Sequence, residues 1–205
     1  MHHVRRLRRN TLFELVLTIA IGLALALSVE AYAVKPYRIP SGSMEPTLNV
    51  GQRVLVNRIG HRLGGDPKVG DVVVFRPPRG AIAMACSDPH SGDGTPRPCA
   101  RPGSGHHSQV FIKRVVAVGG DTIAIREGHV IRNGQLADEP FIRPCGGTDG
   151  CDFPEPIRVP RGDVFLMGDN RGESDDSRYW GPVAVTRVIG KAVVSYWPPS
   201  RVGGL

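Results

Sequence analysis

The longest apolar run of the chain lies near its N-terminus. Residues 12–29 read LFELVLTIAIGLALALSV with Glu14 as the single charge, and residues 32–34 extend the run. This length reaches the lower limit for a helix that crosses a bilayer. Four arginines precede the run, and positive charge of this kind stays on the cytoplasmic side. We therefore expect a basic cytoplasmic segment, a transmembrane signal-anchor helix and an extracytoplasmic domain at residues 1–10, 11–34 and 35–205, respectively.

Two other interpretations of the run are open. An arginine-rich start, an apolar centre and the sequence Ala31-Tyr32-Ala33 also fit a cleavable signal peptide. The run is long for such a peptide, and Glu30 is unusual beside a cleavage site. A buried helix of a soluble protein would show a polar stripe at helical spacing, and none recurs here. The two leading interpretations both place the rest of the chain outside the cytoplasm.

Beyond the run, short segments rich in valine and isoleucine often alternate apolar and polar positions, and Gly, Asp, Asn or Pro bounds them. This pattern is typical of β-strands. The sequences around Glu127-Gly128 and Asn133-Gly134 predict hairpin turns. We expect a mainly β fold, with an antiparallel β-sheet catalytic domain behind one N-terminal helix. The predicted strands are Arg53–Asn57, Asp71–Arg76, Val110–Val118, Thr122–Arg126, His129–Arg132, Asp163–Met167 and Val188–Trp197.

Two segments lack this periodicity. Residues 77–109 contain six prolines, five glycines and four serines, which predicts a long surface insertion. Residues 140–160 form a second turn-rich loop. We expect neither segment to carry chemistry.

The formal net charge is +7, and a basic domain can serve nucleic acid or an anionic membrane surface. Export removes the compartment in which nucleic acid would be met. We therefore expect the lipid bilayer, and no nucleic acid, as a partner.

The chain has four cysteines, all in the expected exported part: Cys86, Cys99, Cys145 and Cys151. An even number outside the cytoplasm predicts two disulfides, for which three connectivities exist. Pairing of sequence neighbours is the simplest of them. A zinc site of Cys86, Cys99, His106 and His107 is the alternative, although the spacing matches no compact zinc motif.

Ser41-Gly42-Ser43 directly follows the apolar run and its short stem. Two serines around a glycine permit a tight turn that exposes a hydroxyl together with its own backbone N–H, as a nucleophile beside an oxyanion site requires. On composition alone, an ordinary Ser/Gly/Pro linker explains the segment better.

The chain uses arginine 22 times and lysine only at positions 35, 68, 113 and 191. Lys113 and Lys191 lie among apolar strand residues, where burial would lower the lysine pKa. A neutral lysine can take the proton of a serine hydroxyl, which arginine cannot do because it stays charged. The residues leave these two lysines as rival general bases, and a solvent-facing strand lysine is the alternative for either.

Residues 167–181 form a dense polar loop between strands, which predicts a hydrogen-bonded scaffold. A calcium loop is the alternative, but the carboxylates lack the EF-hand order and its terminal Glu. None of the seven histidines lies in this loop or in the Ser43 and Lys113 segments, so nothing here predicts a Ser–His–Asp triad.

Together, these segments resemble the bacterial type I signal peptidase family. Four boxes stand in the order of that family: Ser-Gly-Ser-Met-x-Pro-Thr-Leu, Gly-Asp-Val-Val-Val-Phe, Lys-Arg-Val-x-x-x-x-Gly-Asp and Gly-Asp-Asn-Arg-x-x-Ser-x-Asp-Ser-Arg. Here they are Ser41–Leu48, Gly70–Phe75, Lys113–Asp121 and Gly168–Arg178. The match covers nearly all of the chain after the apolar run, except the 77–109 insertion.

The resemblance implies a role for each matched residue. Ser43 would be the nucleophile and Lys113, rather than Lys191, its general base. The Ser41 hydroxyl would bind the oxyanion together with the Ser43 N–H, and Ser174 would hydrogen-bond and orient Lys113. Three further residues would hold the site together through ion pairing: Asp169, Asp176 and Arg178.

The resemblance also implies the reaction. The expected enzyme is a membrane serine endopeptidase that removes signal peptides from exported preproteins, after small residues at positions −1 and −3. It would need no cofactor and no metal. A self-cleaving repressor would share the Ser–Lys chemistry but needs a DNA-binding domain. A tethered β module for adhesion gives no reason for the serine turn and the lysine, and a specialised processing peptidase would differ only in its substrate.

Overall fold

A computed structural model of the chain describes residues 2–62, 64–83, 86, 88, 94–101, 103–105, 107–146 and 150–205. Side chains are described for these residues except 2–10, 26, 28–32, 61, 62, 80 and 82. His106, one residue of the zinc alternative, lies outside the described part.

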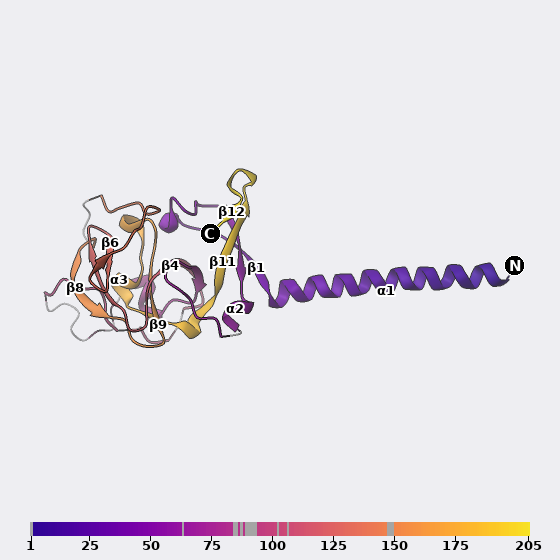
Figure 1. Cartoon of the computed structure of the whole chain (residues 1–205), viewed down its shortest axis with the longest axis horizontal. Helices are drawn as coiled ribbons and strands as arrows, with labels where there is room; N and C mark the ends of the chain where they lie inside the picture. Colours follow the sequence, from indigo (N-terminus) through magenta and orange to yellow (C-terminus); the bar gives the residue numbers. More distant parts are fainter. Residues whose placement is uncertain are drawn as a thin grey trace.

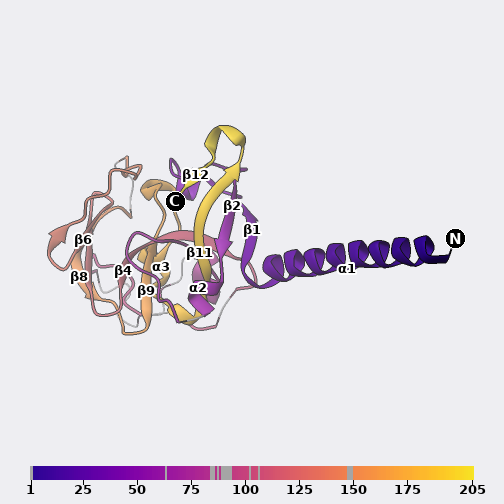
Figure 2. The same cartoon turned by 45° about the vertical axis from the view of Figure 1, so that its right-hand side comes forward.

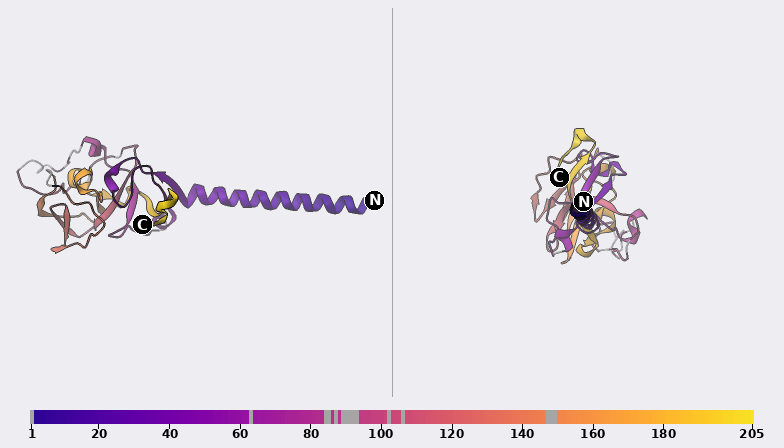
Figure 3. Two further views of the ribbon diagram at one scale, coloured as in Figure 1. Left: turned by 90° about the horizontal axis from the view of Figure 1, so that it is seen from above. Right: turned by 90° about the vertical axis from the view of Figure 1, so that its right-hand side faces the viewer.

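A single long helix and a β domain make up the chain (Figure 1). The helix α1 covers His2–Tyr32, and its described apolar side chains, from Leu12 to Leu27, are exposed. Figures 1, 2 and 3 agree that α1 projects away from the β domain and meets it only at its C-terminal end. Within the part of the chain that the structure describes, no helix combines the length and the apolar character needed to span a membrane.

The larger sheet is antiparallel throughout and runs in the order β1-β2-β11-β3-β4-β9-β10, with β12 paired to β11. Figure 2 shows β1, β2 and β11 at the side nearest α1, and β4 and β9 deeper in the domain. The strands are β1 (Val34–Arg38), β2 (Arg53–Asn57), β3 (Val72–Phe75), β4 (Phe111–Val118), β9 (Asp163–Met167), β10 (Val183–Ala184), β11 (Val188–Trp197) and β12 (Gly203–Gly204).

A second antiparallel sheet of four strands lies at the far side of the domain from α1 (Figure 1). Its order is β7-β6-β5-β8, with β5 at Thr122–Arg126, β6 at His129–Arg132, β7 at Gln135–Leu136 and β8 at Phe153–Arg158. Glu127 and Gly128 both have positive φ, as do Asn133 and Gly134. Two-residue hairpin turns of this kind require positive φ at both central residues, so both predicted turns are formed.

Short helical turns join the strands. They are η1 (Gly42–Met44), α2 (Ile59–Arg62), η2 (Arg79–Ala83), η3 (Arg171–Glu173), α3 (Ser177–Trp180), η4 (Val185–Arg187) and η5 (Pro199–Arg201).

All seven predicted strands are present with bounds that differ by at most one residue at an end. The description of residues 140–160 as a loop without strands is wrong, because β8 lies within it. Pro154 and Pro156 hid this strand, since proline cannot donate to a strand ladder. The sheet tolerates them because β8 is an edge strand, paired only to β5.

The core of the larger sheet fixes the turn that follows β1. Ile39, Met44 and Leu48 are fully buried in one cluster with valines of β2 and β3. Burial of each such side chain is worth about 1.5–3 kcal/mol. Since Met44 directly follows Ser43, this packing determines where Ser43 lies.

Candidate active site

Ser43 sits in the short η1 turn, between β1 and the buried Met44. The chain leading into the turn is held to the domain because the Ile39 N–H donates to the Gln52 carbonyl at 2.8 Å. Ser43 itself is nearly buried, with 9% of its surface exposed. The Ser41-Gly42-Ser43 segment is therefore a packed turn, not a free linker.

Lys113 points from β4 toward this turn. Its Nζ donates to Ser43 Oγ at 2.7 Å, and only 4% of the residue is exposed. Burial disfavours the ammonium form and lowers the pKa of Lys113 to about 8, against an opposing contribution from the Asp176 carboxylate. A lysine that loses its proton near neutral pH is suited to take the proton of the hydroxyl it contacts.

Lys191, the rival lysine, faces a different environment. It lies on β11, its side chain is 48% exposed, and its Nζ pairs with Asp71 Oδ1 at 2.5 Å. The contact that the structure gives its amine is with Asp71 and not with Ser43. The geometry therefore favours Lys113 as the base candidate.

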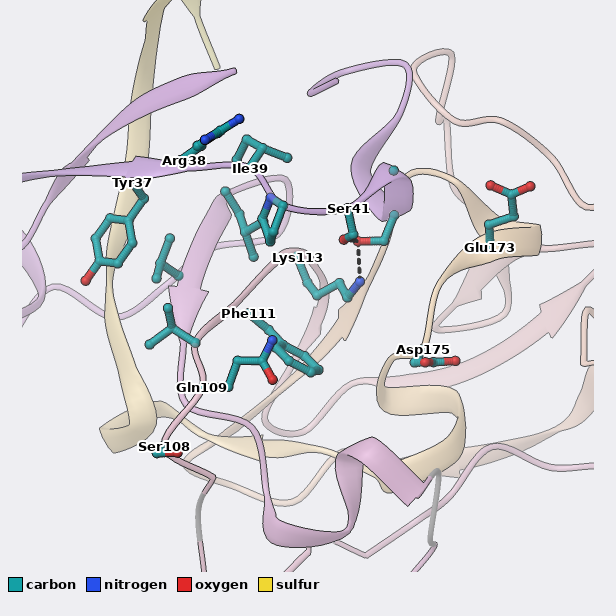
Figure 4. A pocket seen from close by; sticks show the side chains of 16 residues that line it. Tyr37, Arg38, Ile39, Ser41, Ser108, Gln109, Phe111, Lys113, Glu173 and Asp175 are labelled. Atoms are coloured by element: carbon teal, nitrogen blue, oxygen red, sulfur yellow. Dashed lines mark hydrogen bonds between the residues drawn. The ribbon is translucent and has the colours of Figure 1, made fainter. Parts of the chain in front are cut away.

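Ser41 lies at the mouth of the same turn. It is exposed, and its Oγ donates to Ser43 Oγ at 3.4 Å. The two hydroxyls and the Lys113 amine thus converge on one point, as the dashed contact in Figure 4 shows for the lysine.

Asp176 and Arg178 form a fully buried ion pair next to Lys113. Arg178 Nε donates to Asp176 Oδ1 at 2.8 Å, and Arg178 Nη2 donates to Oδ2 at 3.0 Å. Burial alone would raise the pKa of Asp176, but the Arg178 guanidinium holds it below its usual value. The ionised Asp176 carboxylate favours the ammonium form of Lys113, and so it limits how far burial lowers the pKa of this lysine.

Asp169 does not join that pair, but accepts a bidentate contact from Arg114 Nε and Nη2 at 2.8 and 2.7 Å. Thr47 Oγ1 donates to the same carboxylate at 2.6 Å. The Asp169 carboxylate therefore joins β4, which also carries Lys113, to the segment after Ser43, which carries Thr47. Sequence reasoning missed Arg114 and Thr47, although an arginine beside a lysine within an apolar strand was a usable signal.

Ser174 differs from the expectation. It is buried, and its Oγ has no hydrogen-bond partner among the described residues, so the predicted bond to Lys113 is not formed in this structure. The Ser174 hydroxyl instead lies against Gly168, where an added Cβ would come within 2.2 Å of it. Lys113 Nζ is directed at Ser43.

Asn170 is a third residue that sequence reasoning missed. Its backbone N–H donates to the Ser43 carbonyl and its Nδ2 donates to the Gly42 carbonyl, each at 3.1 Å. With 1% exposure, it is buried against the serine turn. Asn170 lies within the polar loop that the sequence indicated, but nothing in the sequence pattern indicated that it would hydrogen-bond to the serine turn.

The cysteines pair as sequence neighbours, with sulfur–sulfur distances of 2.02 Å for Cys86–Cys99 and 2.10 Å for Cys145–Cys151. Because these sulfurs are covalently joined, Cys86 and Cys99 are not available as zinc ligands. The described residues contain no group of three or more side chains suited to hold a metal ion.

Both disulfide-closed loops contact Arg178. The Cys99 N–H donates to the Arg178 carbonyl at 2.9 Å, and Arg178 Nη1 donates to the Gly150 carbonyl at 3.1 Å. Neither contact involves a reacting group, so the expectation that residues 77–109 and 140–160 carry no chemistry stays a prediction. The two loops support the site through the arginine that pairs with Asp176.

A cavity of about 780 Å³ opens beside Ser43 and Lys113. Tyr37 and Gln109 lie on one side of Lys113, and Glu173 and Asp175 lie on the other (Figure 4). Ser108 and Gln109, at the end of the 77–109 insertion, belong to the lining. The cavity is large enough for several residues of an extended peptide that passes over the Ser43 hydroxyl.

The sequence of this chain is similar to those of known proteins. The model of the family described as "Signal peptidase, peptidase S26" matches residues 12–197. Signal peptidase I of Leptolyngbya laminosa is 34% identical over 96% of this chain and 85% of its own. Signal peptidase I of Mycobacterium tuberculosis is 35% identical over 97% of this chain and 77% of its own. A crystal structure of a signal peptidase I from Enterococcus faecalis matches with 23% identity and a TM-score of 0.39, over 61% of this chain and 95% of that one.

Proposed function

Since the chain belongs to the signal peptidase family, peptidase S26, we propose that it is a signal peptidase I in which Ser43 and Lys113 form the catalytic dyad. The enzyme is a serine peptidase that removes signal peptides. The observation that carries the residue assignment is the 2.7 Å contact between Lys113 Nζ and Ser43 Oγ at a buried lysine.

The proposed reaction is acyl transfer to Ser43 and then to water. Neutral Lys113 takes the Ser43 proton while Oγ bonds to the carbonyl carbon of the scissile peptide. The carbon–nitrogen bond then breaks, and Lys113 returns the proton to the leaving amine. In the second half, Lys113 takes a proton from water, the hydroxide attacks the ester, and Ser43 regains its proton as the signal peptide leaves.

The negative charge that develops on the carbonyl oxygen needs donors. We assign this role to the Ser43 N–H and the Ser41 hydroxyl, which lie on the same turn as the nucleophile. Removal of one such donor typically slows a reaction by about a hundred- to a thousand-fold. Ser41 is exposed toward the substrate side, which supports its contact with a bound peptide.

Exported preproteins with small residues at −1 and −3 are the proposed substrates. The cavity beside the dyad supports a peptide substrate, because an extended chain in it can place the carbonyl of the −1 residue against Ser43. The resemblance of the four sequence boxes to those of the type I signal peptidase family implies this preference.

We further propose that residues 11–34 anchor the enzyme in the membrane, with residues 1–10 in the cytoplasm and residues 35–205 outside. The apolar run at 12–29, the four preceding arginines and the exposed apolar side chains of α1 support this topology. Alkaline carbonate extraction of membranes tests it. The full chain is expected in the membrane pellet, and recovery in the supernatant would contradict the anchor.

Purified full-length enzyme and a preprotein with alanine at −3 and −1 test the activity and the nucleophile together. Wild type and Ser200→Ala, an exposed serine of η5, are expected to cleave after the −1 alanine. Ser43→Ala is expected to leave the preprotein intact. Cleavage by Ser43→Ala at the wild-type rate would overturn the assignment.

A further inference from the structure

Asn170 holds both peptide groups that flank the Ser43 Cα. Its side chain Nδ2 donates to the carbonyl of Gly42, which belongs to the Gly42–Ser43 peptide, at 3.1 Å. Its backbone N–H donates to the carbonyl of Ser43, which belongs to the Ser43–Met44 peptide, also at 3.1 Å. One residue, itself 1% exposed, therefore fixes the backbone on each side of the nucleophile.

The first of these contacts sets the direction of the Ser43 N–H. A peptide group is planar, so its N–H and C=O point in opposite directions and turn together. A donor that fixes the Gly42 oxygen thereby fixes the Ser43 N–H. The contact matters at this position because glycine is the residue whose backbone rotates most freely.

The Asn170 carboxamide is itself fixed. Its Nδ2 also donates to Glu173 Oε2 at 3.1 Å, so both hydrogens of the amide have acceptors. Both acceptors are oxygens, and this determines which end of the carboxamide faces Gly42. The Gly42 carbonyl receives a second bond from the Glu45 N–H at 3.0 Å, which closes the η1 turn.

We propose that Asn170 is a positioning residue of the oxyanion site, which directs the Ser43 N–H toward the carbonyl oxygen of the substrate. This inference rests on the proposed dyad function, because it assigns the Ser43 N–H as an oxyanion donor. Asn170 touches neither the substrate nor the Lys113 amine in this role. Its effect is therefore on the transition state and not on substrate binding.

Steady-state kinetics with Asn170→Ala and Asn170→Asp test the proposal. Alanine removes the donor, and aspartate keeps the shape but places a carboxylate oxygen at the Gly42 carbonyl. Both are expected to lower kcat by about 10- to 100-fold, less than loss of the oxyanion donor itself, with KM within about twofold. In Asn170→Ala, which adds no charge, the acidic limb of the pH–rate profile is expected to stay in place, because Lys113 is untouched.

Glu173 supplies a test that does not risk the fold, since it is exposed and lies outside the core. Glu173→Ala removes one acceptor of the Asn170 amide and is expected to lower kcat about 2- to 10-fold. Glu173→Gln keeps an acceptor oxygen and is expected to restore the rate. A loss of similar size in both Glu173 variants would contradict the proposal, because it would reflect charge and not orientation.

Asn49→Ala, in the same loop as Ser43, is the matched control and is expected to behave as wild type. A wild-type kcat in both Asn170 variants overturns the proposal, as does a loss in Asn170→Ala that appears in KM or in a shifted pH profile. The proposed function is judged separately in the same assay. If Ser43→Ala cleaves the preprotein, the dyad itself is wrong, whatever the Asn170 variants do.

Discussion

Lys113 Nζ and Ser43 Oγ lie 2.7 Å apart, although the two residues are separated by 70 positions in the sequence. The contact is formed because β4 carries the lysine into the sheet interior while buried Met44 and Leu48 fix the serine turn against the same core. One structural arrangement therefore explains both the contact with the hydroxyl and the burial of Lys113, which lowers its pKa to about 8.

The lowered lysine pKa predicts the pH dependence. The active form needs neutral Lys113, so kcat/KM for preprotein cleavage should rise about tenfold per pH unit up to about pH 8 and then level off. At pH 7, about one lysine in ten would be neutral, compared with about one in several thousand at the ordinary value. Lys191→Ala, at the exposed lysine, serves as the control and should leave this limb in place. A profile that keeps rising to pH 10 in wild type would contradict the buried base.

The burial of the Lys113 ammonium is also expected to lower the free energy of unfolding. The folded pKa of Lys113 lies below the ordinary lysine value of 10.5, so the folded state holds this proton less tightly than the unfolded state. The penalty is full below pH 8 and disappears as the pH rises toward 10.5. Lys113→Met should therefore be inactive yet about 1–3 kcal/mol more stable than wild type at pH 7, measured by denaturant unfolding. A less stable Lys113→Met variant would show that the lysine contributes to folding instead.

The buried Asp176–Arg178 pair predicts two linked effects. Asp176→Asn would leave the Arg178 guanidinium buried without its counterion, which typically costs about 3–5 kcal/mol. It would also remove the carboxylate that raises the pKa of Lys113, so the acidic limb of the pH–rate profile should move to lower pH. Thermal unfolding and the pH profile of one protein preparation check both effects. An unchanged limb in a folded variant would mean that Asp176 does not act on Lys113.

The Cys145–Cys151 bond predicts a link between disulfide formation and activity. Its loop supplies the Gly150 carbonyl that accepts from Arg178, so the double substitution Cys145→Ala, Cys151→Ala should loosen the arginine. We expect a loss of about 2 kcal/mol in unfolding free energy and a reduced kcat. Reducing agent added to the wild-type enzyme should give at least this change, because it can also open the Cys86–Cys99 bond. Equal activity of the double variant and wild type would separate the loop from catalysis.

Much of the fold followed from local pattern. Alternation of apolar and polar residues located seven strands, and Glu127-Gly128 and Asn133-Gly134 located two hairpins because their backbone requirement is local. The strand β8 was missed because its two prolines are compatible only with an edge position, which depends on the assembled sheet. The strand β1 was read as a stem, since its pairing with β2 is likewise a tertiary property.

The candidate active site could be predicted from the sequence only in part. Residue type made Ser43 a candidate, although an ordinary linker explained its segment better. It also left Lys113 and Lys191 as rivals, because burial of a strand lysine depends on which face the sheet covers. The partners of Asp169 and Asn170 are distant in sequence, 55 positions to Arg114 and 128 to Gly42, and no spacing rule connects them. The expected Ser174 contact to Lys113 came from motif position alone, and the structure directs that hydroxyl elsewhere.

The rate of preprotein cleavage by Lys113→Arg tests the central assignment most directly. Arginine keeps the length and positive charge of the side chain but cannot become neutral near physiological pH. If Lys113 is the base that takes the Ser43 proton, the folded variant should show no cleavage between pH 7 and 9, while Lys191→Arg cleaves at the wild-type rate. Cleavage by Lys113→Arg at a rate close to wild type would contradict the Ser43–Lys113 dyad.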